Sequence, residues 1–473
     1  MSGQKNRFYA DIMATHPGVT GSCILCVVKE CGGKTIKFAV DCGLFQGQEH
    51  SEFNKSLPFN TEELDFMLLT HNHVDHTGRI AFAVKHGFSK PIYMTKTTSR
   101  IIHPALKDSC KVLRDLAKRN NEKPLYEEKD IEIAMPLIRQ CDFNETIEVL
   151  PNVKVTFFIN GHLLGSALIL VQISSEQQSE DINLLFTGDY NNKNMFFDVP
   201  DLPQWVLDLP LTIIQESTYG DMDSNEIKPC FESNILEAVH ERKTIVVQVF
   251  SLGRSQEISY ILKNLQDSND LDVNIPIYLD GSLTQEYTRI FLEEDVGIKE
   301  SAKDFLPRNL TYINKGNRWD VVEDTDCKII LTSSGMGSYG PAQVHIPEVI
   351  SRKNGLIHFT GYTAEGTLGR RLQETEYRAT VSVGGLVVRK FGDVKYTKEF
   401  SAHAKADEMI AFLQKFNHLK LVLINHGEPE VKETFATRVL DSVETKNVGV
   451  LGRDYLFRIN PYGLVKTMGT KFC

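Results

Sequence analysis

The sequence predicts an α/β protein with two domains. Its 473 residues are more than one ordinary hydrophobic core accommodates. Apolar, strand-like runs recur along the chain and alternate with segments of helical periodicity. Several of these strands end directly in a histidine, aspartate or glutamate. Because α/β folds place their active sites in the loops at strand ends, we expect these residues to form one site on a rigid sheet.

The individual elements follow from the hydrophobic pattern. Strands are expected at 36–41, 64–70, 167–173, 182–187, 211–215, 244–249, 277–279, 328–331, 356–359 and 420–425. Helices are expected at 79–86, 255–266, 283–292, 407–416 and 431–443.

The composition is that of a globular protein, with 41% hydrophobic and 24% charged residues. The net charge of −10 argues against a general nucleic-acid binder, although residues 351–400 carry nine Lys and Arg against five acids. No secretory signal and no apolar run of about 20 residues are evident, so we expect a cytoplasmic protein without a membrane span. Cys23 and Cys26 have CxxC spacing within an apolar run, and we interpret them as core residues.

The strongest signal for chemistry is the segment 70–78, Thr-His-Asn-His-Val-Asp-His-Thr-Gly, which follows an apolar strand. In a tight loop, His71 and His73 can point at one metal ion, and Asp75 and His76 can turn toward a second. Imidazole and carboxylate are good zinc ligands. The alternative is an exposed histidine-rich loop without a metal.

One loop cannot complete two coordination spheres, so further ligands are needed. His162, Asp189 and His426 each follow a strand and adjoin a glycine, which lets the backbone turn tightly. Each residue alone is typical of a cap or turn. Together with the first loop, they supply the missing ligands.

These motifs resemble those of the metallo-β-lactamase superfamily. The chain is further similar to its β-CASP branch, which includes the nucleases of messenger-RNA 3′-end processing and ribonuclease J. The matching segments run from 19–22 and 41–47 to 426–428 and cover about nine tenths of the chain. The resemblance implies that His71, His73 and His162 hold one zinc ion and that Asp75, His76 and His426 hold the second. It also implies that Asp189 and a hydroxide bridge these two Zn²⁺ ions.

Further segments resemble the β-CASP branch specifically. They are Glu216 after a strand, His403 within 400–404, and an insertion with motifs at 250–254, 332–336 and 360–371. Arg254, Ser333, Ser334 and Arg370 are candidates for binding RNA phosphate, because glycine-flanked backbone and arginine suit phosphate; ordinary turns are the alternative. Many relatives have Asp where this chain has Lys405, which we expect to open a surface helix.

The resemblance implies a four-layer αββα metallo-β-lactamase fold from residues 1–218 and 399–473. An α/β β-CASP domain, 219–398, would cover the metals and leave the site in a cleft. Two zinc ions can activate a shared water and clamp a phosphate. The candidate catalytic residues are Asp75, Glu216 and His403, with His403 as general acid and Glu216 orienting it.

The expected function is hydrolysis of RNA phosphodiester bonds, leaving a 5′-phosphate and a 3′-hydroxyl. Endonuclease action is favoured, because the chain lacks the additional C-terminal domain of ribonuclease J. His426 favours RNA over DNA, because the DNA-repair members of the branch usually carry an apolar residue there. A DNA nuclease, a small-molecule hydrolase and a non-catalytic RNA-binding scaffold are the alternatives. RNA is the expected partner, and a homodimer is left open.

Overall fold

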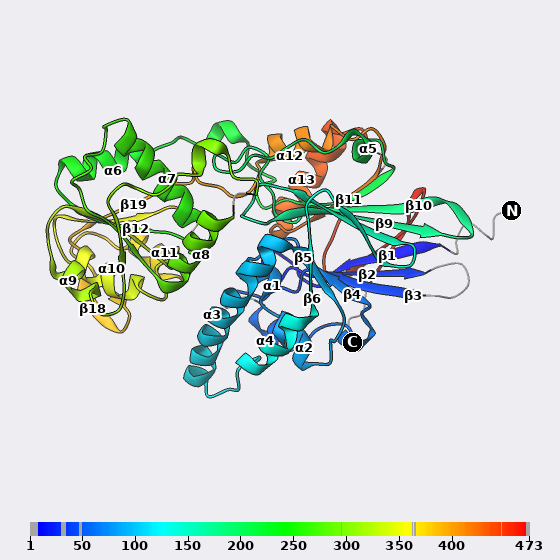
Figure 1. Cartoon of the computed structure of the whole chain (residues 1–473), viewed down its shortest axis with the longest axis horizontal. Helices are drawn as coiled ribbons and strands as arrows, with labels where there is room; N and C mark the ends of the chain where they lie inside the picture. Colours follow the sequence, from blue (N-terminus) through cyan, green and yellow to red (C-terminus); the bar gives the residue numbers. More distant parts are fainter. Residues whose placement is uncertain are drawn as a thin grey trace. The chain divides into compact units, whose positions relative to one another are not determined.

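The computed structural model describes residues 8–29, 35–46, 50–294, 296–361, 363, 366–445 and 447–469. Four residues of the motifs above, Gly47, Tyr362, Ala364 and Glu365, lie outside the described residues. The chain divides into two compact units (Figure 1). Unit 1 comprises Met1–Asn194, Asp198–Ser224 and Ala402–Cys473, and unit 2 comprises Met195–Phe197 and Asn225–Ser401.

Unit 1 contains two mixed sheets. The first has the order β23-β22-β1-β2-β3-β4-β5-β6, and the second has the order β21-β20-β11-β10-β9-β8-β7. The strands of the first sheet are β1 (Tyr9–Ala14), β2 (Ile24–Lys29), β3 (Thr35–Val40), β4 (Phe66–Leu68), β5 (Ile92–Thr95), β6 (Ile138–Cys141), β22 (Tyr455–Asn460) and β23 (Gly463–Gly469). Those of the second are β7 (Thr146–Leu150), β8 (Val153–Ile159), β9 (Ala167–Ser175), β10 (Gln178–Phe186), β11 (Leu211–Glu216), β20 (Leu419–Asn425) and β21 (Val448–Val450).

Helices cover the outer faces of both sheets. Against the first sheet pack α2 (Ile80–Lys85), α3 (Lys96–Asn120) and α4 (Glu128–Ala134), whereas α1 (Val74–Thr77) forms part of the loop after β4. Against the second sheet pack α5 (Gln204–Leu207), α12 (Ala406–Leu413) and α13 (Pro429–Ser442). A third apolar cluster, formed by strands of both sheets, lies between them. The predicted αββα order is therefore confirmed.

This layering explains why the sequence reads as long apolar runs. In β2, Cys26 and Val28 face the cluster between the sheets, whereas Leu25 faces the helical layer. A strand that is buried on both faces does not alternate between polar and apolar residues. Cys23 and Cys26 are buried free thiols, as expected of core residues.

Unit 2 is an α/β domain with the parallel sheet order β14-β13-β15-β12-β16-β19. Its strands are β12 (Thr244–Gln248), β13 (Ile277–Asp280), β14 (Leu310–Ile313), β15 (Lys328–Thr332), β16 (Gly355–Phe359) and β19 (Asp393–Tyr396); β17 (Thr380–Val383) and β18 (Leu386–Arg389) form a separate hairpin. Its helices are α6 (Phe231–His240), α7 (Arg254–Asp267), α8 (Ser282–Glu293), α9 (Arg318–Glu323), α10 (Ala342–Ile350) and α11 (Leu368–Glu374). Separate apolar clusters on the two faces of the sheet, one with α6 and α7 and one with α10 and α11, form the core. Within the described ranges, no helix has the length and apolar character needed to cross a membrane.

Candidate metal centre

The predicted ligands gather in unit 1, where strands of the two sheets end in loops. β4 leads into His71, His73 and α1, which carries Asp75 and His76. On the second sheet, β8, β10 and β20 lead into His162, Asp189 and His426, respectively. The two sheets thus supply the seven side chains from their loop ends, as the sequence predicts.

The first group of ligand atoms belongs to His71, His73, His162 and Asp189, which all lie within 4.8 Å of one another. His162 Nε2 lies 3.1 Å from His73 Nδ1. His71 Nε2 lies 3.6 Å from Asp189 Oδ2. Three ring nitrogens and a carboxylate oxygen therefore converge on one point.

The second group is formed by Asp75, His76 and His426. His76 Nε2 lies 3.1 Å from His426 Nε2, and Asp75 Oδ2 lies 3.8–3.9 Å from both nitrogens. Asp189 Oδ2 lies 3.3 Å from His76 Nε2, and its Oδ1 lies 3.1 Å from His426 Nδ1. Asp189 therefore adjoins both groups, which is the position of a bridging carboxylate.

Hydrogen bonds on the far sides of the rings decide which nitrogen faces the centre. His162 Nδ1 donates to Ala402 O at 2.7 Å, so its Nε2 carries a lone pair. His76 Nδ1 donates to Asp41 Oδ2 at 2.8 Å. His426 Nδ1 lies 3.0 Å from the Thr218 hydroxyl, which itself donates to Glu216. Such outer partners fix the tautomer of metal-binding histidines.

These residues fit a pair of divalent cations. With their Nδ1 atoms engaged elsewhere, His76 and His426 present two Nε2 atoms to each other at 3.1 Å, a contact that either a shared proton or a cation stabilises. His71 Nε2 and Asp189 Oδ1 are buried and have no hydrogen-bond partner within the described part of the chain. Imidazole nitrogens with carboxylate oxygens form a donor set that zinc accepts.

The protonation of Asp75, His73 and His162 is consistent with a cation site. Burial lowers the pKa of His76, but the charges of Asp189 and Asp41 outweigh burial and raise it well above its ordinary value, so a cation would have to displace its proton. Burial would raise the pKa of Asp75, but the neighbouring His426, His76 and His73 imidazoles lower it to about 2. Burial lowers the pKa of His73 to about 4 and that of His162 well below its ordinary value. The carboxylate is thus ionised and these two imidazoles are neutral at physiological pH, which are the forms that bind metal.

Unusual backbone conformations hold the ligands in place. Gly161 (φ 74°) and Gly188 (φ 53°) precede His162 and Asp189, and a Cβ at Gly188 would lie 2.7 Å from Thr70 Cβ. His426 itself has a φ of 46°, in the left-handed region that non-glycine residues rarely adopt. Strained conformations of this kind persist where the surrounding structure enforces them, often at functional sites.

His403 and Glu216, the predicted acid and its orienting residue, form a pair beside the metal ligands. His403 Nδ1 donates to Glu216 Oε2 at 2.9 Å, and the His403 ring lies 4.8 Å from that of His162. The backbone N–H of Tyr190 and the Thr218 hydroxyl also donate to Glu216, each at 2.7 Å. Burial lowers the pKa of His403, but the charges of Glu216 and Asp189 outweigh burial and raise it. The pair therefore favours a protonated imidazole.

Three residues without a predicted role contribute to this centre. Asp41 accepts hydrogen bonds from His76 Nδ1 and from the backbone N–H and hydroxyl of Thr70. Thr218 links Glu216 to His426, as described above. His16 accepts a hydrogen bond from Cys23 N at 3.2 Å, and burial followed by the nearby His426 lowers its pKa. Asp41 lies within the matching segment 41–47, but only the folded structure reveals what these three side chains bind.

The four candidate phosphate-binding residues lie in unit 2, near the carboxyl edge of its sheet. Ser333 follows β15, Arg254 begins α7 after β12, and these two strands are neighbours. The loop after β15 contacts the start of α11, where Met336 O accepts from Gly369 N beside Arg370. Arg254 is buried, with Nε 2.9 Å from Glu257 and Nη1 donating to Thr360 O. Arg370 forms an exposed i,i+4 ion pair with Glu374.

Lys405 differs from its expected surroundings. It precedes α12, as predicted, but its side chain is buried and its Nζ lies 3.3 Å from the centre of the Tyr219 ring. The position at the start of the helix is thus as predicted, whereas the lysine side chain itself lies below the surface. The aromatic face accepts the ammonium group, so the helix can begin in a buried position.

Comparison with known proteins identifies both parts of the chain. Residues 255–372 match the Beta-Casp domain, and residues 389–448 match the Zn-dependent metallo-hydrolase RNA specificity domain. A ribonuclease of Thermus thermophilus is 29% identical, over 87% of this chain and 91% of its own length. An RNase J-like protein of Methanocaldococcus jannaschii is 28% identical, over 85% and 89%. The transcription termination factor FttA of Methanococcus maripaludis is 28% identical, over 87% and 68%.

The double-sheet sandwich and its histidine–aspartate site define a metal-dependent hydrolase with the metallo-β-lactamase fold. Within that class, the two matching domains and the ribonuclease relatives support the β-CASP family. The chain spans about two thirds of the length of FttA and about nine tenths of the two shorter relatives.

Proposed function

We propose that this protein is a zinc-dependent ribonuclease that cleaves RNA phosphodiester bonds endonucleolytically and leaves a 5′-phosphate and a 3′-hydroxyl. The observation that carries the proposal is the position of Asp189, which adjoins two groups of ligand atoms beside the His403–Glu216 pair. A site for two cations with a proton donor alongside suits phosphodiester hydrolysis. The names of the ribonuclease relatives favour RNA as the substrate.

The proposed ligands divide into two sets. His71, His73 and His162 hold one ion, and Asp75, His76 and His426 hold the other; Asp189 belongs to both sets. Zinc ions in these positions supply Lewis acidity, which lowers the pKa of water and neutralises charge on a phosphate. The ionised carboxylate of Asp75 keeps the second set attractive to a cation.

The protein's own residues handle the proton. His403, protonated because Glu216 and Asp189 favour its charged form, donates a proton to the leaving 3′ oxygen. Glu216 holds the His403 ring through Nδ1, which leaves Nε2 as the donating atom. Tyr190 N and Thr218 saturate the same carboxylate, so it keeps its orientation. Three buried contacts thereby position one acid.

The cation-binding and catalytic roles can be tested separately. We expect His403→Ala to slow cleavage of an end-labelled RNA about 100-fold or more while metal content stays at the wild-type level. We expect Asp189→Ala to lose metal and activity together. Three further measurements test the alternatives. Cleavage of a matched DNA oligonucleotide would indicate a DNA nuclease, and turnover of a β-lactam or lactone would indicate a small-molecule hydrolase. RNA cleavage that a chelator abolishes would exclude a non-catalytic scaffold. Full activity of Asp189→Ala would refute the two-metal proposal.

Other expectations remain predictions of the same proposal. We predict that Ser333, Ser334 and Arg370 bind RNA phosphates at the carboxyl edge of the unit 2 sheet. Arg254 could do so only after breaking its hydrogen bonds with Glu257 and Thr360. The lid role of residues 219–398 and the cytoplasmic location are likewise predicted, and a homodimer is left open.

A further inference from the structure

Helix α3 carries a regular row of basic side chains. Lys96, Arg100, His103, Lys107, Lys111, Arg114 and Lys118 follow one another at intervals of three or four residues. Residues at this spacing lie on one side of a helix. From Lys96 to Lys118 the row is roughly 33 Å long, at about 1.5 Å per residue. We call these seven residues the α3 stripe.

The charge of this helix stands against that of the whole chain. Within α3, seven Lys and Arg face only two acids, Asp108 and Asp115, a balance of 7 − 2 = +5 in a chain whose net charge is −10. A local excess of this kind creates a positive potential that a general surface lacks. The α3 stripe is therefore a candidate contact surface for a polyanion.

The stripe lies beside the buried face of the helix and is open to solvent. Leu106, Cys110 and Ala117 are buried on the adjacent side of α3. Lys96, Lys111 and Lys118 are exposed and form no ion pair with any residue that the structure describes. They are therefore available to an external anion.

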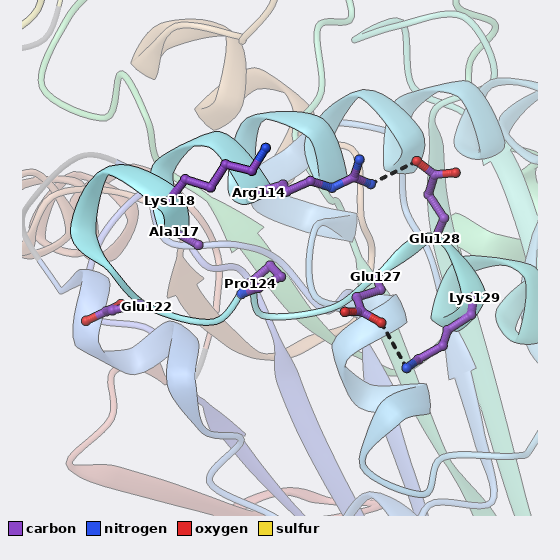
Figure 2. Close-up of a pocket in the computed structure, with 8 residues that line it drawn as sticks. All are labelled: Arg114, Ala117, Lys118, Glu122, Pro124, Glu127, Glu128 and Lys129. Carbon is purple, nitrogen blue, oxygen red and sulfur yellow. Dashed lines mark hydrogen bonds and ion pairs between the residues drawn. The ribbon is translucent and has the colours of Figure 1, made fainter.

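Three other cations of the stripe are paired with carboxylates of α4. Glu132 pairs with His103 and Lys107, and Glu128 pairs with Arg114 at 2.9 Å. Figure 2 shows Arg114 and Lys118 extending from the same helix, with Glu128 opposite Arg114 and no marked partner for Lys118. Exposed pairs of this kind contribute little stability, so phosphate can compete for these cations.

The stripe begins beside the metal ligands of the same unit. Thr95, the N-cap of α3, and Thr98 both donate to Gly165 O, at 2.6 and 2.9 Å. Gly165 lies three residues after His162, and α3 packs against α1, which carries Asp75 and His76. Helix α3, which carries the row, starts beside α1 and runs away from it (Figure 1).

We propose that the α3 stripe binds the phosphate backbone of a single RNA strand and guides it to the metal centre; this rests on the ribonuclease function proposed above. The cations recur about once per helical turn, roughly every 5.4 Å, which suits a regularly spaced polyanion. The helix has no Phe, Tyr or Trp on which bases could stack. Binding is therefore through phosphate and independent of base sequence.

The test compares two triple variants. Lys96→Gln/Lys111→Gln/Lys118→Gln removes the unpaired stripe cations, and Lys90→Gln/Lys154→Gln/Lys466→Gln removes three exposed lysines elsewhere in unit 1. Binding of a fluorescent 30-nucleotide RNA is measured by anisotropy across a salt series, with chelator present so that no cleavage occurs. The melting temperature of each variant checks folding.

We expect the stripe variant to bind about tenfold more weakly at 0.1 M salt, with the slope of log K against log salt shallower by about 2, since single strands release roughly 0.7 counterions per contact. The loss should shrink for a four-nucleotide RNA, which spans only the first turns. Equal losses of RNA affinity in both variants, or an unchanged salt slope, would overturn the proposal. Wild-type RNA binding by the stripe variant in the presence of an acidic competitor protein would also overturn it.

Cleavage by the metal-loaded wild type separates this inference from the function on which it rests. Stripe-dependent binding without cleavage of any RNA would refute the ribonuclease function and leave the phosphate-binding surface. Cleavage that does not depend on the stripe would refute the surface and leave the ribonuclease function.

Discussion

Replacing Asp41 by asparagine should weaken one metal position and leave the other intact. The Asp41 carboxylate is 2% exposed and accepts from Thr70 N at 2.9 Å and from His76 Nδ1 at 2.8 Å. An asparagine has the same shape but only one acceptor oxygen. If that oxygen keeps Thr70, the amide NH₂ faces His76 Nδ1–H, and two donors oppose each other. His76 must then move its proton to Nε2, the atom that faces His426.

The magnitude follows from that tautomer change. Loss of an outer partner of a metal-binding histidine typically costs 10- to 100-fold in metal affinity, or about 1.4–2.7 kcal/mol. The opposite amide orientation leaves the Thr70 donors unpaired, which costs about 1–3 kcal/mol of folding stability. We therefore expect Asp41→Asn to bind the ion of Asp75, His76 and His426 about 10- to 100-fold more weakly.

The assay is titration of metal-free protein with zinc against a chelating dye, with unfolding by urea measured in parallel. Asp65→Asn is the matched control, because Asp65 also accepts a backbone N–H, that of Lys37 at 2.8 Å, but lies away from the ligands. We expect Asp41→Asn to bind one equivalent of zinc with lowered affinity and a second equivalent with wild-type affinity. Two wild-type affinities in Asp41→Asn would show that Asp41 does not control the tautomer of His76.

Three other perturbations test parts of the same structure. Thr218→Val should lower metal affinity at His426 and slow cleavage about tenfold or more, because the Thr218 hydroxyl links His426 to Glu216 at 3.0 and 2.7 Å. Thr218→Ser should restore both metal affinity and cleavage. Failure of the serine variant to restore them would mean that Thr218 acts through packing. Gly188→Ala should lose about 2–5 kcal/mol of stability in urea unfolding, since its φ is 53° and the new Cβ would meet Thr70. The control Gly385→Ala, where φ is also positive but the space is open, should lose about 1–2 kcal/mol. Equal losses in the two variants would rule out the clash with Thr70. Burial lowers the pKa of Lys432 to about 8, so the unfolded chain binds more protons between pH 8 and about 10.5, and this group makes the fold about 2 kcal/mol more stable at pH 9.5 than at pH 7.5. Lys432→Met should lack that rise, so the difference in unfolding free energy between wild type and variant should change by about 2 kcal/mol between pH 7.5 and pH 9.5. Parallel pH profiles of the two proteins would contradict the buried charge.

The elements that the sequence predicts best are those whose apolar period is set by one buried face. α7, α8 and α13 span Arg254–Asp267, Ser282–Glu293 and Pro429–Ser442, each within two residues of the expected limits. The longest helix, α3, has no counterpart among the expected helices. Its amphipathic period is strong, but Pro104 lies within it, and a proline inside a helical pattern is typical of a helix break. Its burial against α4 and the first sheet stabilises it instead.

The same distinction applies to the site. Histidines and aspartates directly after strands can be found in a sequence, because a strand end fixes where the next residue lies. The role of Asp41 cannot be found in this way, since it depends on which side chain of another loop meets its carboxylate, 35 residues along the chain at His76. Its φ of 63° points the same way, because the sequence around it, Val40-Asp41-Cys42, contains nothing that demands a left-handed residue. Tautomer control is thus a property of tertiary structure, even where every ligand is visible in the chain.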